Sequence, residues 1–129
     1  MKVVKEEDPG IIFTYNGDNF DFPYLIERAE QKSVKLDTGR DGSGISSRRG
    51  RSRKSYSVAG RETIDLYKVV ERDLGEVKVR TLENVAEFLG LVKKGERTNL
   101  KQEEMIELWE HRKENGLEKL RKYTLDDAV

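Results

Sequence analysis

Residues 15–25 read Tyr15-Asn16-Gly17-Asp18-Asn19-Phe20-Asp21-Phe22-Pro23-Tyr24-Leu25 and pass through three kinds of local structure. The run that leads into them, Ile11-Ile12-Phe13-Thr14-Tyr15, is β-branched and aromatic, which is typical of a strand covered on both faces. Asn16 to Asn19 supply the Gly and Asn side chains that suit a turn. A helix from about residue 22 to residue 32 should follow, with Pro23 in its first turn and with Tyr24, Leu25, Arg28 and Ala29 on one stripe of its surface.

The rest of the chain is mostly helical in pattern. Residues 1–8 resemble the last turns of a helix, which Pro9-Gly10 ends. Further helices are expected over residues 65–72, 81–89 and 102–115 and from residue 117 onward. Asp65 and Thr81 are expected as N-caps, and Gly90 and Gly116 as C-terminal ends. The pattern predicts one α/β domain over residues 1–129, with one or a few strands and four or five helices.

Composition excludes several classes of site. The chain has 129 residues, no Cys and one His, so disulfides, thiolate metal sites, cysteine nucleophiles and His-rich zinc sites are excluded. Charged residues make up 39%, and 25 basic residues balance 25 acidic ones, so carboxylates are the plentiful metal ligands. No run approaches the roughly 18 apolar residues of a membrane span, and the N-terminus has no signal-peptide pattern. We expect a soluble, cytoplasmic protein.

A basic stretch occupies the middle of the chain. Between Gly42 and Arg61 there is no acid, and the cations are Arg48, Arg49, Arg51, Arg53, Lys54 and Arg61. The alternation Tyr56-Ser57-Val58 indicates the returning arm of a β-hairpin. Such a cluster can contact phosphates and bind nucleic acid in a salt-dependent way. A solvated loop is the alternative, because no aromatic is interleaved before Tyr56.

Two segments together resemble a known family. Residues 15–25 resemble the second exonuclease motif of archaeal family B DNA polymerases, and Tyr123-Thr124-Leu125-Asp126-Asp127-Ala128 resembles the third motif, Tyr-x-x-x-Asp on a helix. Residues 36–43 and 60–67 are also similar to that family, so the resemblance covers nearly the whole chain. It implies a partial RNase H-like 3′–5′ exonuclease fold that is helix-rich, with a reduced sheet and a basic β-hairpin near the primer–template junction.

The resemblance also assigns roles to residues. Asp21 and Asp127 match carboxylates that hold the Mg²⁺ or Mn²⁺ ions of a two-metal phosphodiester hydrolysis. Tyr123 lies one helical turn before Asp127, on the same helix face, and matches the residue that orients the attacking water. Asn16 and Phe20 match positions that hold the 3′-terminal nucleotides of DNA. The basic residues Arg48, Arg49, Arg51, Arg53 and Lys54 are the further candidates for DNA contact.

The departures from the family pattern limit this reading. No Asp-x-Glu occurs upstream of Tyr15, so the first motif and its two carboxylates are missing, and no polymerase motif is present. We therefore expect a truncated domain that is inactive or weakly active alone and holds at most one loosely bound ion. Two alternatives are a split-enzyme piece whose partner chain supplies the missing carboxylates, and a non-catalytic module that binds replication proteins. A third is a stable fragment without a surviving role.

Individual residues have simpler readings too. Asp21 could be a helix N-cap, and Phe20 a partly buried aromatic. Met105, Leu108 and Trp109 are expected as the buried stripe of their helix, and His111 is given no role. In the family that the chain resembles, the strand matching residues 11–14 lies inside a sheet, flanked by strands of the missing N-terminal half, so we expect a homo-oligomer, or a partner chain, at the strand edge near residues 11–15.

Overall fold

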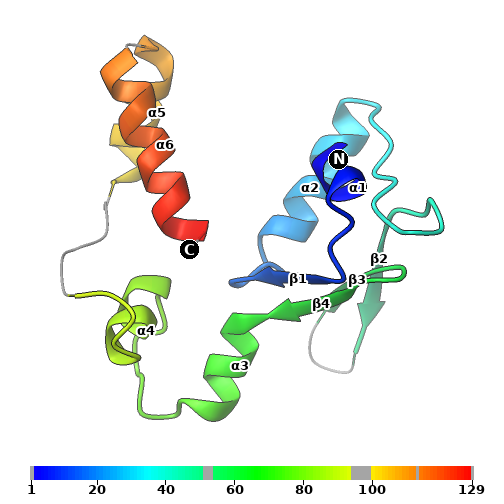
Figure 1. Cartoon of the computed structure of the whole chain (residues 1–129), viewed down its shortest axis with the longest axis horizontal. Coiled ribbons are helices and arrows are strands. Elements are labelled where there is room, and N and C mark those ends of the chain that lie inside the picture. Colours follow the sequence, from blue (N-terminus) through cyan, green and yellow to red (C-terminus); the bar gives the residue numbers. More distant parts are fainter. Residues whose placement is uncertain (1, 51–53, 94–99, 113, 129) are drawn as a thin grey trace. The chain divides into compact units, whose positions relative to one another are not determined.

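The computed structural model describes residues 2–50, 54–93, 100–112 and 114–128. The chain divides into two compact units, residues 1–75 and residues 76–129. Within the described residues there are four strands, where one or a few were predicted, and six helices, one more than the predicted four or five. Figure 1 shows their order along the chain. None of the described helices is both long enough and apolar enough to cross a membrane.

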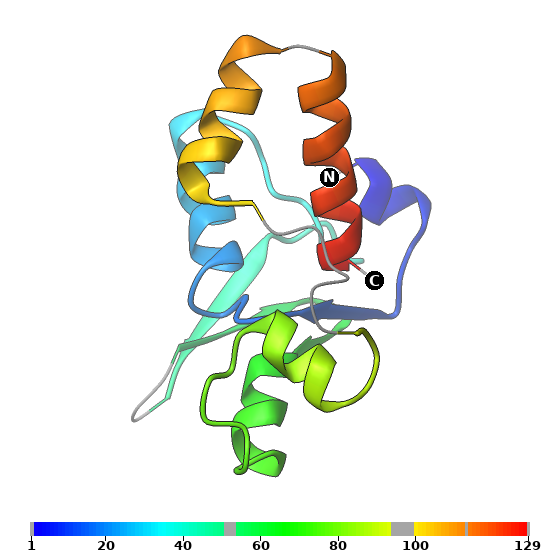
Figure 2. The same ribbon diagram turned by 90° about the vertical axis from the view of Figure 1, so that its left-hand side faces the viewer.

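The first unit contains both small sheets and three helices. Its elements are α1 (Lys2–Glu6), β1 (Ile11–Thr14), α2 (Asp21–Gln31), β2 (Ile45–Arg49), β3 (Lys54–Val58), β4 (Glu62–Asp65) and α3 (Leu66–Asp73). Strand β1 pairs in parallel with β4, and the register places Ile11 opposite Glu62 and Thr14 opposite Asp65. Figure 2 shows these two strands side by side. The predicted strand and the helix that follows it are therefore confirmed.

Strands β2 and β3 form a separate antiparallel hairpin. Ile45 pairs with Val58, and Arg49 pairs with Lys54. Tyr56 and Val58 are buried on one face of β3, as the alternation of apolar and polar residues predicts. Residues 51–53, which separate the two strands in the sequence, lie outside the described residues. The returning arm of the hairpin is thus confirmed.

Two expectations about burial in this unit are wrong. Ile11 and Phe13 of β1 are 51% and 59% exposed, so within the described residues the strand is not covered on both faces. In α2 the buried residues are Phe22 and Ala29, whereas Tyr24 remains largely exposed. The observed stripe shares Ala29 with the expected one, but its buried aromatic is Phe22 and not Tyr24.

A buried arginine ties the start of the first unit together. The side chain of Arg61 is 3% exposed, and its guanidinium donates to the carbonyl oxygens of Val4, Pro9 and Thr38 and to the carboxylate of Asp8. Such a fork satisfies several acceptors at once, which offsets the cost of burying the charge. Arg61 therefore belongs to the framework of the fold, and its inclusion in the cluster of cations that could contact phosphates is wrong.

The second unit contains three helices, α4 (Leu82–Phe88), α5 (Gln102–His111) and α6 (Glu114–Ala128).

Both predicted N-caps are confirmed, because the Asp65 side chain accepts from Tyr67 N and the Thr81 side chain accepts from Asn84 N. Gly90 has a φ of 70°, the left-handed conformation expected of a residue just after a helix.

The boundary between α5 and α6 differs from the prediction. Helix α5 ends at Arg112, which adopts the left-handed conformation with a φ of 45°, and α6 begins before Gly116. Gly116 does not end a helix; it lies inside α6, where a β-carbon would come within 3.1 Å of Leu108 Cδ2. The prediction that Gly116 ends a helix is therefore wrong, because this glycine packs against Leu108 inside α6.

The expected buried stripe of α5 is also only partly right. Met105 and Leu108 are half-buried, whereas Trp109 is 58% exposed. The Arg112 guanidinium lies 5.2 Å from the centroid of the Trp109 ring, a cation–π distance. Trp109 therefore lies on the outside of this helix and does not belong to the core of its unit.

Candidate functional site

Residues 15–20, between β1 and α2, form a tight loop whose shape depends on backbone hydrogen bonds. Asn16 has a φ of 64°, and its carbonyl oxygen accepts from the amides of Asn19 and Phe20 at 3.1 Å each. The carbonyl oxygen of Gly17 accepts from the Phe22 amide at 2.9 Å. Asn is one of the few residues that adopts this left-handed conformation at low cost. The local bonds fold the loop back onto the start of α2.

Gly17 is required at its position by close packing. A β-carbon on residue 17 would lie 2.4 Å from Thr14 Cβ, far inside van der Waals contact. The loop can pass this close to the end of β1 only because Gly has no side chain. The Asn-Gly pair of the sequence motif therefore has two distinct structural reasons, one conformational and one steric.

The carboxylate of Asp65 holds the loop from the end of β4. Its Oδ1 accepts from the Asn16 amide at 2.7 Å and from the Tyr67 amide at 3.1 Å, and its Oδ2 accepts from the Asp18 amide at 3.2 Å. Asp65 is 9% exposed, so these are buried, charge-assisted bonds. One side chain thereby caps α3 and fixes two amides of the loop.

Asp18 is the second buried acid at the loop. It is 7% exposed, its Oδ1 accepts from the Tyr56 amide of β3 at 2.9 Å, and its Oδ2 forms an ion pair with Lys68 of α3. The sequence analysis assigned no role to Asp18 or Lys68. Their separation of 50 positions leaves no local pattern that would have revealed the pair.

Two aromatic contacts pack around the loop. The rings of Phe22 and Tyr56 stack at a centroid distance of 5.6 Å and an angle of 25°. The rings of Tyr15 and Tyr67 meet edge to face at 5.8 Å. Aromatic pairs of both kinds add to the stability gained from burial. They connect the loop to the hairpin on one side and to α3 on the other.

Asp21 lies in the first turn of α2 and is exposed. The N-cap residue of α2 is Phe20, and no side chain caps this helix, so the alternative reading of Asp21 as an N-cap is wrong. An acid in the first turn is favoured by the partial positive charge of the helix N-terminus. The exposed carboxylate is open to a ligand from solvent.

The two candidate nucleotide-contact residues of the loop differ in exposure. Phe20 is 71% exposed, so its reading as a partly buried aromatic is wrong. Asn16 is half-buried, and its Oδ1 accepts from the Asn19 side-chain amide at 2.7 Å. The structure therefore leaves the Phe20 ring free on the surface and holds Asn16 in the loop.

The basic residues of the hairpin are described in part. Arg48 and Lys54 are exposed on β2 and β3. The Arg49 side chain and the whole of Arg51 and Arg53 lie outside the described residues. Next to the start of β3, a hollow of about 210 Å³ is lined by Asn19, Lys54, Tyr67, Lys68 and Glu71. The hollow adjoins the loop at residues 15–20. The positive charges of its two lysines are offset by the negative charges of Glu71 and of Asp18, which pairs with Lys68.

The third-motif residues lie on α6, in the second unit. Tyr123 is half-buried and Asp126 is half-buried, while the Asp127 side chain lies outside the described residues. Tyr123 and Asp127 are four positions apart on one helix, which places them on the same face. The structure describes this motif within its own unit, separately from the unit that carries Asp21.

The described residues do not form a metal site by themselves. Across the described ranges, no group of three or more His, Asp or Glu side chains is arranged to hold a metal ion. Asp21 offers a hard oxygen ligand of the kind that Mg²⁺ and Mn²⁺ prefer, but a single exposed carboxylate binds such ions weakly. Any tight site would need ligands beyond those that the described part of the chain brings together.

Comparison with known proteins identifies the family. Residues 1–85 match the family described as "DNA polymerase family B, exonuclease domain". A DNA polymerase of Pyrococcus glycovorans is 41% identical over 129 residues, covering 99% of this chain and 16% of its own length. DNA polymerase 2 of Aeropyrum pernix is 45% identical over 125 residues, covering 97% of this chain and 15% of its own length.

A solved structure agrees with these sequence matches. The family B DNA polymerase from the hyperthermophilic archaeon Pyrobaculum calidifontis aligns with a TM-score of 0.84 and 37% identity, over 98% of this chain and 16% of the polymerase. The chain spans about one sixth of the length of the relatives it matches. Likeness at this level extends over nearly every residue, so both the resemblance and the α/β exonuclease fold are confirmed. The chain belongs to the exonuclease domain of family B DNA polymerases.

Proposed function

We propose that this chain supplies the second- and third-motif residues of a metal-dependent 3′–5′ DNA exonuclease and is inactive or weakly active alone. The observation that carries the proposal is the loop at residues 15–20, which is anchored in the fold and presents the exposed Asp21 carboxylate at the start of α2. A loop without a function would not need to be held in place by so many contacts. Asp21, Asp127 and Tyr123 are the catalytic candidates, and Asn16 and Phe20 would contact the DNA strand.

The weak activity follows from the ligand count. Two-metal hydrolysis needs several carboxylates around two ions about 3.5–4 Å apart. Asp21 and Asp127 are only two, and no Asp-x-Glu pair precedes Tyr15 in this sequence. A segment that contributes two further carboxylates is therefore required for efficient turnover.

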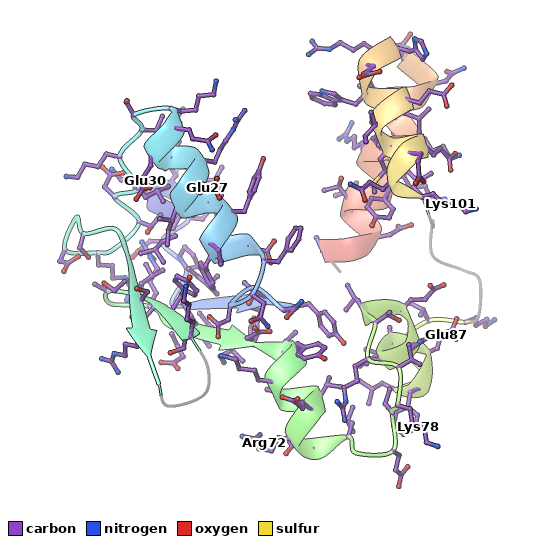
Figure 3. The ribbon with its side chains drawn as sticks, turned by 180° about the vertical axis from the view of Figure 1, so that it is seen from behind. Glu27, Glu30, Arg72, Lys78, Glu87 and Lys101 are labelled. Carbon is purple, nitrogen blue, oxygen red and sulfur yellow. The ribbon has the colours of Figure 1, made fainter. Side chains whose placement is uncertain are left out.

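The test is degradation of 3′-labelled single-stranded DNA with Mn²⁺, by the full chain alone and with a separately expressed segment carrying an Asp-x-Glu strand. We expect little or no degradation alone and an increase with the added segment. Asp21→Ala should abolish the increase. Glu30→Ala is the matched control, because Glu30 is another exposed acid of α2 (Figure 3). Efficient degradation by the chain alone, unaffected by Asp21→Ala, would refute the proposal.

Metal binding gives an independent test of the same site. We expect a calorimetric titration of the full chain with Mn²⁺ to show at most one weak site, removed by Asp21→Ala and kept by Glu30→Ala. Two carboxylates repel each other only modestly, so little free energy is gained when a second ion binds and neutralises them. Two tight sites on the isolated chain would contradict the ligand count given above.

The hairpin supports DNA binding as a second candidate function. Arg48 and Lys54 are exposed on paired strands, and the sequence adds Arg49, Arg51 and Arg53 between them. Cations gathered at one end of a hairpin can neutralise several phosphates at once. Binding of this kind needs no metal and no nuclease activity.

The hairpin is tested by replacing Arg48, Arg49, Arg51 and Arg53 with Ser. We expect single-stranded DNA binding to be lost and the slope of affinity against salt to fall by about 0.7 for each phosphate contact removed. The double variant Arg48→Ser/Lys54→Ser should show part of this effect. Lys78→Ser/Lys101→Ser is its control, since both lysines are exposed outside the hairpin (Figure 3). Equal affinity of the quadruple variant and the parent would exclude the hairpin.

A further inference from the structure

Asp18 and Asp65 are buried acids to which the proposed exonuclease site assigns no chemistry. Burial of a carboxylate is costly unless donors surround it. Here, three backbone amides donate to Asp65, and one amide and one ammonium group donate to Asp18. All five donors belong to residues outside the element that carries the acid, and four of them lie at least 38 positions away along the chain. The arrangement therefore does more than neutralise two charges.

We infer that Asp65 and Asp18 are positioning residues that set the place of Asn16, Phe20 and Asp21 in the exonuclease site; the functional part of this inference rests on the proposed function. The loop is internally bonded through Asn16 O and Gly17 O to the amides of Asn19, Phe20 and Phe22. Fixing the Asn16 and Asp18 amides therefore fixes the whole loop. Asp65 supplies both of these fixed points from the end of β4.

Helix capping alone does not account for Asp65. An N-cap needs a single acceptor for an amide two or three residues ahead, and the bond to the Tyr67 amide meets that need. The bonds to the Asn16 and Asp18 amides reach 49 and 47 positions back along the chain. These two bonds serve the loop.

Asp18 extends the same support to the hairpin. Its carboxylate accepts from the Tyr56 amide, and the Tyr56 ring stacks on Phe22, the neighbour of Asp21. Lys68 pairs with Asp18 and lies 3.4 Å from the carbonyl oxygen of Lys54, where β3 begins. The Asp18 carboxylate thus supports both β3 of the basic hairpin and Asp21, the metal-ligand candidate. In this geometry the hairpin and Asp21 keep a fixed spacing.

The experiment separates loop positioning from helix capping. Asp65→Ser keeps a good cap for α3 and removes the two bonds to the loop. Hydrogen exchange of the Asn16 and Asp18 amides is measured by NMR on the full chain, without metal or DNA. We expect both amides to exchange at least about tenfold faster, and the Phe20 and Asp21 amide resonances to shift. Thr81→Ala removes the cap of α4 and should change none of these four signals.

Three further variants resolve the individual bonds. Asp65→Asn keeps one acceptor oxygen for Asn16 and Tyr67, so only the Asp18 amide should exchange faster, again by about tenfold. Asp18→Ala should speed exchange of the Tyr56 amide about tenfold, whereas Asp18→Asn, which keeps an acceptor, should change it less than about threefold. If Asp65→Ser does not fold, Asp65→Asn or Asp18→Ala takes its place as the test.

Each result of the exchange experiment either supports the inference or overturns it. Unchanged protection of Asn16 and Asp18 in Asp65→Ser, with the fold intact, overturns the inference. Faster exchange combined with unshifted Phe20 and Asp21 resonances also overturns it, because the loop would then not depend on the two bonds. Absence of nuclease activity even after the Asp-x-Glu segment is added to the parent overturns the proposed function but leaves the exchange result valid, so the two failures can be told apart.

Discussion

The second-motif loop and the third-motif helix are equally visible as short patterns, yet they are supported in different ways. The loop at residues 15–20 is held by Asp65, Tyr56 and Lys68 through bonds that span 38 to 50 positions. Tyr123 and Asp127 owe their common face to the regular spacing of α6, and the Thr124 hydroxyl donates to the Leu120 carbonyl within the same helix. The comparison teaches that a motif of the first kind is rigid only if distant residues fold with it, whereas the second kind forms wherever its helix forms.

The largest effect should come from removing the most buried distant anchor. Arg61→Ala leaves the carbonyl oxygens of Val4, Pro9 and Thr38 without their donor and creates a cavity, so we expect it to lower the free energy of unfolding by about 3 kcal/mol. Arg112→Ala removes only a local contact with Trp109 and should cost about 0.5 kcal/mol. Urea unfolding followed by circular dichroism measures both. Equal losses would break the contrast between distant and local support.

The same substitution at two glycines gives the next largest difference. In Gly17→Ala the new methyl would lie 2.4 Å from Thr14 Cβ, so the loop must shift, and we expect a loss of about 2 kcal/mol. In Gly116→Ala the methyl would lie 3.1 Å from the flexible end of Leu108, and the gain in helix propensity of about 1 kcal/mol offsets this contact. Gly116→Ala should therefore stay within about 0.5 kcal/mol of the parent. Comparable losses at both glycines would show that the loop yields as easily as the helix.

Sequence reasoning could predict the elements whose signals are local. The strand at residues 11–14, the helix after Asp21 and the N-caps Asp65 and Thr81 follow from side-chain type and spacing within a few positions. The exonuclease family was likewise recognisable from residues 15–25. These features carry their cause in neighbouring residues, so one sequence was enough.

The parts that sequence reasoning missed have causes far along the chain. Nothing in the basic stretch distinguishes Arg61, because its acceptors are mostly backbone carbonyls, which every residue has. Asp18 gains its role from Tyr56 and Lys68, which no spacing rule connects to it. The break at Arg112 has neither Gly nor Pro to mark it. Tertiary contacts decide the roles of Arg61 and Asp18, and the break at Arg112 has no local sequence signal.

Strand β1 has an open edge, which bears on how copies of the chain associate. Within the described residues β1 pairs with β4 alone, and Ile11 and Phe13 on it are exposed. We propose that a second copy of the chain pairs along residues 11–15, because exposed apolar strand edges favour such pairing. Phe13→Lys should weaken the homodimer at least about tenfold, which is about 1.4 kcal/mol.

Light scattering across a concentration series measures this association. Phe88→Lys is the matched control, since Phe88 is an exposed aromatic of α4 in the second unit and should leave the oligomer unchanged. A parent protein that stays monomeric at high micromolar concentration would contradict the proposed dimer. Association that persists in Phe13→Lys would place the contact elsewhere.

The smallest effect concerns acid stability and again contrasts distant with local pairing. Hydrogen bonds from Arg40 and then Arg61 hold the pKa of Asp8 below its usual value of 3.8. A hydrogen bond from its neighbour Arg72 (Figure 3) likewise lowers the pKa of Asp73 from 3.8. A lowered carboxyl pKa stabilises the folded state above the unfolded value, and that stabilisation is lost as the pH falls from 3.8 through the folded value.

The two acids should nevertheless differ in what they contribute. Arg72 and Asp73 are adjacent and can pair in the unfolded chain as well, so their interaction largely cancels in the free energy of unfolding. Asp8 meets Arg40 and Arg61 across 32 and 53 positions, and these contacts exist only after folding. Asp8→Asn should therefore flatten the loss of stability below pH 4 more than Asp73→Asn does, by a margin that shrinks in 1 M salt because Asp8 is exposed. Urea midpoints measured between pH 2.5 and 7 test this, and identical profiles for the two variants would mean that pairing over a long span gives this unit no advantage over pairing between neighbours.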